Sequence, residues 1–269
     1  AEGLLRMINE TNYPTPPPKL YGLPRSGGTL IYNVMNHIFD GNVGPQSHDY
    51  FEFSADEATT DDPRWSASLP PIVAVYRDFR DSLASQWRAY TLDRTGANLP
   101  KMSLAQVYSS ALGQKQAVQA LYSFREYQKN HPDQKILFLR YEDFFDSTRG
   151  DVNFDFLFQQ FEEFFGICED DVLTKEKKDY IRKEFCFSSQ KKFASNFKSF
   201  HEGFDPDLTG DDRMKALADS GLLEELEKRQ IHGNHLNTGK STWKDLISPE
   251  HYEIVNQILG DELRDWGYL

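Results

Sequence analysis

An eight-residue segment near the start of the chain, GLPRSGGT at positions 22–29, has the composition of a loop that binds phosphate. Its glycines let the backbone approach a ligand closely, and the N–H groups that begin a following helix attract an anion. The spacing matches the nucleoside-triphosphate loop G-x4-G-K-[ST], except that Gly28 stands at the lysine position. The segment therefore disfavours a triphosphatase, while Arg25 supplies an alternative positive charge. The alternative for this segment, considered alone, is an ordinary glycine-rich turn between a strand and a helix.

A second set of polar residues follows the apolar run IVAVY at positions 72–76. Arg77 comes directly after this run, and Ser85 lies about two helical turns further on. A planar guanidinium binds phosphate through two hydrogen bonds, and a hydroxyl adds one oriented donor. The alternatives are an ion pair of Arg77 with Asp78 or Asp81, and a plain helix serine at Ser85.

The elements that must position these residues alternate between strand and helix. We predict strands at 19–23, 72–76 and 135–140, with helices at 29–39, 78–90 and 103–129. Residues 40–71 look irregular, and the chain from 154 onward looks mostly helical, ending in a helix at 249–264. The expected fold class is α/β, a single domain over residues 1–269 with a central parallel sheet flanked by helices and a helical C-terminal part. Ligands bind at the carboxyl ends of such strands, where the segment 22–29 and Arg77 would both lie.

Composition narrows the classes of partner. Hydrophobic residues make up 39% and aromatic residues 14% of the chain, which indicates a packed globule, and the formal net charge is -12. An acidic surface argues against binding to nucleic acid or to an anionic membrane. No apolar run approaches the ~20 residues of a membrane span, and the first residues lack a signal-peptide pattern, so we expect a cytoplasmic protein. Cys168 and Cys186 are expected to be free thiols, with a single bridge as the alternative.

Several segments resemble PAPS-dependent sulfotransferases, which use 3′-phosphoadenosine 5′-phosphosulfate. LPRSGGT at 23–29 resembles their 5′-phosphosulfate loop, P-[KR]-S-G-T-T, and RDFRDSLAS at 77–85 resembles their 3′-phosphate motif. LRYEDF at 139–144 is similar to their strand ending in Tyr-Glu-Asp. GKSTWK at 239–244 is similar to a variant of their C-terminal Gly-x-x-Trp-Lys loop, and LRDWGY at 263–268 to the last helix of microbial members. The resemblance covers nearly the whole chain.

The resemblance implies a cytosolic or microbial type of enzyme with a P-loop-like phosphosulfate loop. PAPS would be the donor, 3′,5′-ADP the product and a small molecule the acceptor, through a hydroxyl or, as second choice, an amine. The residues implied at the 5′-phosphosulfate are Arg25, Ser26, Gly27, Gly28 and Thr29; those implied at the 3′-phosphate are Arg77 and Ser85, with Gly239 and Lys240 on the far side. For Lys240 the alternative is a solvated surface lysine.

Two departures from the family pattern affect the chemistry. Arg25 replaces the lysine of many members, and because arginine stays charged it stabilises a leaving phosphate but donates protons poorly. Leu30 stands where many cytosolic members have a tryptophan that stacks on adenine. An aromatic residue within 185–200 is the expected replacement.

Sulfuryl transfer needs a base, and a histidine suits this role near neutral pH. Between the two phosphate motifs only His37 and His48 are available. His37 falls within the first predicted helix, so we predict His48 as the base, with a structural histidine as the alternative. In the expected in-line displacement, His48 takes the acceptor proton while Arg25 and Thr29 stabilise the departing nucleotide. No metal is required, because fixed cations and dipoles supply the electrostatic stabilisation.

Two other functions fit the same fold. A P-loop kinase is disfavoured by Gly28 at the lysine position and by Ser85. A catalytically silent nucleotide-binding protein would keep the loop and Arg77 but lack a usable base. The sequence carries no signal for oligomeric state.

Overall fold

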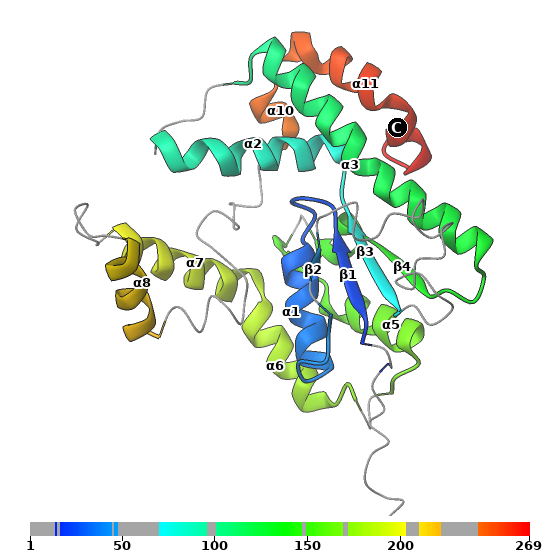
Figure 1. Ribbon diagram of the computed structural model, residues 1–269, viewed down its shortest axis with the longest axis vertical. Helices are drawn as coiled ribbons and strands as arrows, with labels where there is room; N and C mark the ends of the chain where they lie inside the picture. Colours follow the sequence, from blue (N-terminus) through cyan, green and yellow to red (C-terminus); the bar gives the residue numbers. More distant parts are fainter. Residues whose placement is uncertain are drawn as a thin grey trace, which may run out of the picture.

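A parallel sheet lies at the centre of the computed structural model (Figure 1). The structure describes residues 14, 17–44, 46–47, 70–95, 101–146, 149–168, 172–202, 210–221 and 242–269. Among these residues the sheet has four strands in the order β2-β1-β3-β4. The strands are β1 (Lys19–Gly22), β2 (Gln46–Ser47), β3 (Ile72–Tyr76) and β4 (Ile136–Arg140). The α/β fold with a parallel sheet is confirmed, while β2 is a short strand within the region predicted to be irregular.

The strand order reverses between β1 and β3. From β1 the chain continues to β2 on one side of it, and then returns to β3 on its other side. Connections that leave in opposite directions open a crevice at the carboxyl ends of the two strands, where open α/β sheets bind ligands. Gly22 lies opposite Val75 in the register, and the N–H of Leu23 donates to the carbonyl oxygen of Val75 at 2.9 Å. The segments after β1 and β3 therefore start at the same level.

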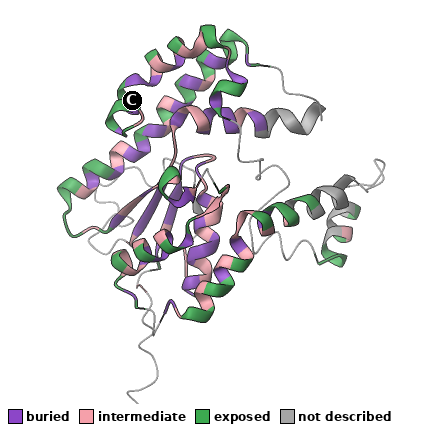
Figure 2. Cartoon of the chain, turned by 180° about the vertical axis from the view of Figure 1, so that it is seen from behind, coloured by how far each residue is buried: buried purple, intermediate pink, exposed green. Residues whose placement is uncertain are grey.

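Hydrophobic side chains pack on both faces of the sheet, because successive residues of a strand point to opposite faces. Tyr21 and Ala74 pack on the face covered by α2 (Phe79–Thr95), α3 (Leu104–Asn130) and α11 (Tyr252–Asp265). Leu20 and Val75 pack on the face covered by α1 (Gly28–Ile38), α5 (Phe154–Phe165) and α6 (Lys175–Phe185). Figure 2 shows the strands buried between these two layers, with the exposed residues on the outer sides of the helices.

The remaining elements all follow β4 in the sequence. They are α4 (Tyr141–Phe144), β5 (Phe145–Asp146), β6 (Asp151–Val152), α7 (Phe187–Glu202), α8 (Gly210–Asp219), α10 (Trp243–Leu246) and a 3-10 helix at Pro249–His251. The C-terminal part is helical, as predicted, and the helix predicted at 249–264 divides into the 3-10 turn and α11. The helix predicted at 78–90 continues to Thr95.

Local sequence signals explain where the long helix α3 begins. The side chain of Ser103 accepts the N–H of Gln106, and the side chain of Gln106 accepts the N–H of Ser103. This reciprocal capping box satisfies two backbone donors that a helix start otherwise leaves unpaired. The start of α3 is therefore fixed close to the predicted position 103.

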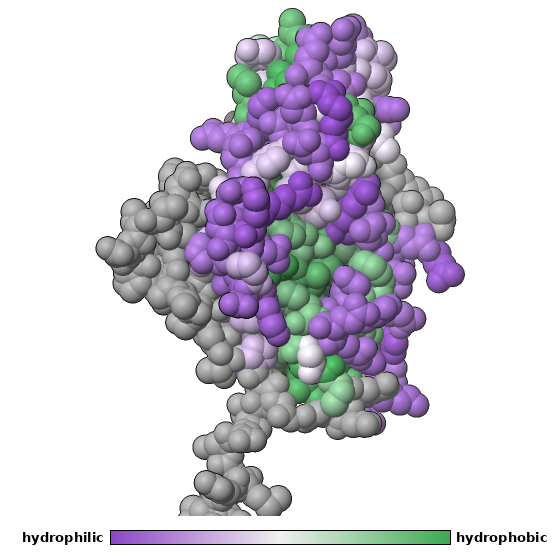
Figure 3. Space-filling view, turned by 90° about the vertical axis from the view of Figure 1, so that its right-hand side faces the viewer, coloured by the Kyte–Doolittle hydropathy of each residue, from purple (hydrophilic) through white to green (hydrophobic). Residues whose placement is uncertain are grey.

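The β4 side of the molecule is partly apolar. β4 is the outer strand of the described sheet, and its Leu137 and Phe138 are only partly buried. Figure 3, seen from the side on which Figure 1 places β4, shows an apolar strip between hydrophilic surfaces.

Cys168 and Cys186 are free thiols, as expected. Within the described part of the chain, no helix is long and apolar enough to span a bilayer.

Candidate active site

The turn after β1 leads directly into α1, and the first turn of this helix contains no carboxylate. Gly27 is the N-cap residue, no side chain caps the helix, and its first turn contains no acidic residue. The first N–H groups of a helix and its dipole favour an anion at this position. The hydroxyl of Ser26 is buried and donates to the carbonyl oxygen of Val75 at 3.0 Å. Ser26, which the resemblance includes in the phosphosulfate loop, therefore anchors the turn to β3 through its hydroxyl.

Gly27 is required by its conformation and by its neighbours. Its φ of +86° lies in the left-handed region, and a Cβ atom placed on it would lie 3.0 Å from Cδ2 of Tyr141 and 3.3 Å from Cζ of Phe144. A side chain at this position would displace an aromatic ring. Arg25 also has a positive φ, 65°, which is unusual for a residue other than glycine. Such strained backbone is concentrated at functional sites.

The turn after β1 contacts the helix after β3. Nε of Arg25 donates to Oγ of Ser85 at 3.3 Å. The hydroxyl of Ser82 donates to the carbonyl oxygen of Pro24. Arg25 and Ser85 were predicted from two separate motifs, and the fold brings them into direct contact.

Arg77 follows β3, as predicted, and is held on two sides. Its guanidinium lies over the ring of Tyr141, 4.6 Å from the ring centroid. Its Nη2 atom is 3.7 Å from Oδ2 of Asp81, so the alternative of an ion pair is present as a long contact. Nε of Arg77 is buried and has no hydrogen-bond partner among the residues that the structure describes. A buried donor without a partner fits a site that an anionic ligand completes.

Tyr141, which begins α4 directly after β4, connects the two loops. One face of its ring receives the guanidinium of Arg77, and its edge lies against Gly27. Burial raises the pKa of the Tyr141 hydroxyl to about 12, although Arg77 opposes this shift. The sequence pattern placed this tyrosine at the end of a strand but gave no indication that its ring contacts both loops.

Sequence reasoning also missed Asp81 and Arg88, which share a face of α2 with Ser85. Asp81 and Ser85 are four residues apart, and Ser85 and Arg88 are three apart, a pattern that keeps the three side chains on one side of the helix. Burial raises the pKa of Asp81 despite the nearby Arg77, and burial lowers the pKa of Arg88. Both charges are therefore carried in a poorly solvated place beside Arg77. The helical spacing was the sequence signal that could have identified them.

Other predicted residues lie at the start of α1 or in the core. Gly28 and Thr29 form the first turn of α1, where the resemblance expects the phosphosulfate. Leu30 packs against the core on the α1 side of the sheet. The prediction that an aromatic residue in 185–200 stacks on adenine is wrong for Phe185, which is 2% exposed and belongs to that same core.

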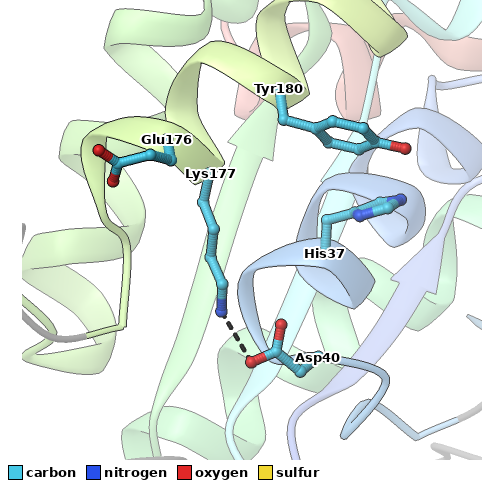
Figure 4. Close-up of a pocket in the computed structure, with 5 residues that line it drawn as sticks. All are labelled: His37, Asp40, Glu176, Lys177 and Tyr180. Carbon is cyan, nitrogen blue, oxygen red and sulfur yellow. Dashed lines mark hydrogen bonds and ion pairs between the residues drawn. The ribbon is translucent and has the colours of Figure 1, made fainter.

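His37 lies near the end of α1 that is opposite to Gly27. Its ring is 5.0 Å from the rings of both Tyr180 and Phe185, so it packs against these neighbours. A surface pocket is lined by His37, Tyr180, Asp40, Glu176 and Lys177 (Figure 4). In this pocket Nζ of Lys177 donates to the carboxylate of Asp40 at 2.8 Å.

Three predicted residues, His48, Gly239 and Lys240, lie outside the described part of the chain. Within that part, no group of three or more His, Cys, Asp or Glu side chains is arranged to hold a metal ion.

Comparison with known proteins identifies a family for this chain. A family model described as the sulfotransferase domain matches residues 67–267, most of the 269-residue chain. No curated protein sequence is similar enough to the chain to count as a match. The matched residues include Arg77, Asp81 and Ser85. The turn at 22–29 lies before the matched residues, but it contacts α2 through the hydrogen bonds of Arg25 with Ser85 and of Ser82 with Pro24. On the extent of the match and the parallel α/β fold that accompanies it, the chain belongs to the sulfotransferase family.

Proposed function

We propose that the protein transfers a sulfuryl group from PAPS to a hydroxyl of a small-molecule acceptor and releases 3′,5′-ADP. The observation that carries this proposal is the contact of Arg25 with Ser85 at 3.3 Å. It joins the residue expected at the 5′-phosphosulfate to a residue expected at the 3′-phosphate, in the crevice where the strand order reverses. An amine is the second class of acceptor.

The proposed donor fits the charges and donors of the crevice. Arg25 and the N–H groups at the start of α1 would bind the 5′-phosphosulfate, where no carboxylate occupies the first turn of the helix. Arg77 and Ser85 would bind the 3′-phosphate. The buried Nε of Arg77, which has no hydrogen-bond partner among the described residues, supports this assignment. Gly239 and Lys240, from the sequence shortly before α10, would add further contacts to this phosphate.

The chemistry follows from these assignments. The acceptor oxygen attacks sulfur and forms a new S–O bond, while the bond from sulfur to the 5′-phosphate oxygen breaks and its electron pair stays on the departing nucleotide. The acceptor proton goes to His48, the proposed base. Arg25 and the helix N–H groups stabilise the charge that develops on the leaving oxygen. Arg25 does not donate a proton, because its guanidinium stays ionised at any working pH.

Calorimetric titrations with 3′,5′-ADP, 5′-AMP and ATP with Mg²⁺ test the donor assignment. We expect binding of 3′,5′-ADP to be the tightest, and Arg77→Ala to weaken it by about 10- to 100-fold, since a hydrogen bond to a charged group contributes roughly 1.5–3 kcal/mol. The variant should bind 5′-AMP like the wild type. Arg264→Ala is a matched control, because Arg264 is exposed and pairs with Asp261 on the outside of α11. Tighter binding of ATP than of 3′,5′-ADP would instead favour a kinase.

Transfer assays with labelled PAPS and pools of hydroxylated and amine metabolites test catalysis and the acceptor class. His48→Ala should lower turnover by about 10² or more and keep 3′,5′-ADP binding. His37→Ala is the control, because His37 packs against Tyr180 and Phe185, and its turnover per folded molecule should stay close to that of the wild type. Binding of 3′,5′-ADP without transfer to any acceptor would identify a silent nucleotide-binding protein.

A further inference from the structure

Two charged side chains of α2 hold a single peptide group of the C-terminal segment. Oδ1 of Asp81 accepts the N–H of Trp243 at 2.8 Å, and Nη2 of Arg88 donates to the carbonyl oxygen of Thr242 at 3.3 Å. This N–H and this carbonyl belong to the same peptide bond, and in a trans peptide they point in opposite directions. Since Asp81 and Arg88 are seven residues apart, or about two turns of α2, the peptide group lies along the helix between them.

Ser85 lies between the two residues on this face of α2. It is four residues after Asp81 and three before Arg88, so the three side chains point to the same side of the helix. Ser85 also contacts Arg25 from the turn after β1. The peptide group of Thr242 and Trp243 therefore lies along α2 beside the serine that we assign to the 3′-phosphate.

The two contacts are made by groups that are costly to bury. Arg88 is 8% exposed, and the side chain of Asp81 is 20% exposed. Trp243 and Leu246 of α10 also pack in the core beside α2, so apolar contacts hold this short helix against α2 as well. Charged side chains that fix one peptide group give orientation, which apolar packing does not.

We propose that Asp81 and Arg88 are positioning residues that orient the Thr242–Trp243 peptide beside Ser85, so that the C-terminal segment forms one wall of the 3′-phosphate site. Asp81 also helps to orient the side chain of Arg77, since Oδ2 of Asp81 is 3.7 Å from Nη2 of Arg77. The pair thereby gives the protein its preference for nucleotides that carry a 3′-phosphate. This inference rests on the proposed function and extends it to the recognition of the donor.

The test measures the ratio of two dissociation constants, Kd for 5′-AMP over Kd for 3′,5′-ADP, by calorimetry. We expect Asp81→Ala and Arg88→Met each to lower this ratio about tenfold, mainly by weakening 3′,5′-ADP binding. Asp81→Asn keeps an oxygen that accepts the Trp243 N–H, so it should lower the ratio less than Asp81→Ala. Arg88→Lys keeps a charged donor and should restore part of the ratio lost in Arg88→Met.

Lys115→Met is the matched control. Nζ of Lys115 donates to the carbonyl oxygen of Ile258 at 3.0 Å and pairs with the buried Glu262 at 3.3 Å. It therefore joins α3 to α11 through a charged side chain, as Arg88 joins α2 to Thr242. A purely structural role predicts the same result for Lys115→Met and Arg88→Met, namely a lower melting temperature and an unchanged ratio.

The outcomes separate the inference from the proposed function. A wild-type protein that binds 5′-AMP as tightly as 3′,5′-ADP would overturn the proposed function. A wild type that prefers 3′,5′-ADP, with the same ratio in the Asp81 and Arg88 variants, would overturn the positioning role alone. Should Asp81→Ala or Arg88→Met fail to fold, Asp81→Asn and Arg88→Lys decide the question by the same ratio.

Discussion

Replacing Gly27 with alanine should destabilise the fold more than the same replacement at Gly41. Both glycines have nearly the same left-handed φ, +86° and +85°. A Cβ atom on Gly27 would meet the ring of Tyr141 at 3.0 Å and that of Phe144 at 3.3 Å, whereas one on Gly41 would have nothing within 4 Å. The two variants therefore share the backbone cost and differ in the steric cost.

The expected magnitudes follow from these two contributions. A left-handed conformation costs an ordinary L-residue roughly 1–2 kcal/mol, and the reduced entropy of the unfolded chain offsets about 0.4–1 kcal/mol of it. Gly41→Ala should therefore lower the free energy of unfolding by about 1 kcal/mol. Overpacking a close contact adds roughly 1–3 kcal/mol, so Gly27→Ala should cost about 2–4 kcal/mol.

Urea unfolding followed by circular dichroism measures both differences, and 3′,5′-ADP titration of the folded variants measures binding. Gly27→Ala should also weaken nucleotide binding, since the displaced Tyr141 ring supports Arg77, whereas Gly41→Ala should not. In a Tyr141→Ala background only the 3.3 Å contact with Phe144 remains, so the cost of Gly27→Ala should fall toward that of Gly41→Ala. Equal destabilisation by the two glycine variants in the wild-type background would refute the claim that the Tyr141 ring excludes a side chain at Gly27.

Three further measurements probe the same region. Burial raises the pKa of Asp81 in the folded state above its unfolded-state value of 3.8. The folded protein therefore favours the neutral carboxyl, and its contribution to the free energy of unfolding is highest below pH 3.8 and falls as the pH rises through the folded-state pKa. Asp81→Asn should therefore be at least as stable as the wild type at pH 7, with an advantage that shrinks toward pH 3; a variant less stable at pH 7 would contradict this. Ser26→Ala should cost about 1 kcal/mol in urea unfolding, because the carbonyl of Val75 still accepts a backbone N–H, and a cost above about 3 kcal/mol would show a larger role for the hydroxyl. Tyr141, with a pKa raised to about 12, should stay un-ionised at pH 10, so the absorbance titrations of wild type and Tyr141→Phe should coincide up to that pH.

The sequence was most informative where a local pattern determines the element. The run at 72–76 is β3 with the predicted bounds, because an unbroken apolar run of this length suits a strand buried on both faces. The position of Arg77 after this strand followed from the same pattern. β2 escaped prediction because Gln46 and Ser47 pair with β1 over only two residues, which is too short for any periodicity.

Contacts between distant parts of the chain left no local signal. The hydrogen bond of Asp81 with Trp243 joins residues 162 apart in sequence, and helical spacing alone showed only that Asp81 shares a face with Ser85. Phe185 illustrates the opposite error, since an aromatic residue suits a base-stacking site and a hydrophobic core equally well by composition. The assignments of His48 and Lys240 stay predictions, because both residues lie outside the described chain.

Intramolecular hydrogen bonds fix the turn after β1. The carbonyl oxygen of Val75 accepts both the N–H of Leu23 and the hydroxyl of Ser26, and Ser82 fastens the turn at Pro24. The conformational entropy of ordering this turn is thus lost once, during folding. If the turn binds the donor as proposed, such preorganisation leaves more of the phosphate-binding energy for affinity, and the same contacts hold the strained backbone of Arg25 in place.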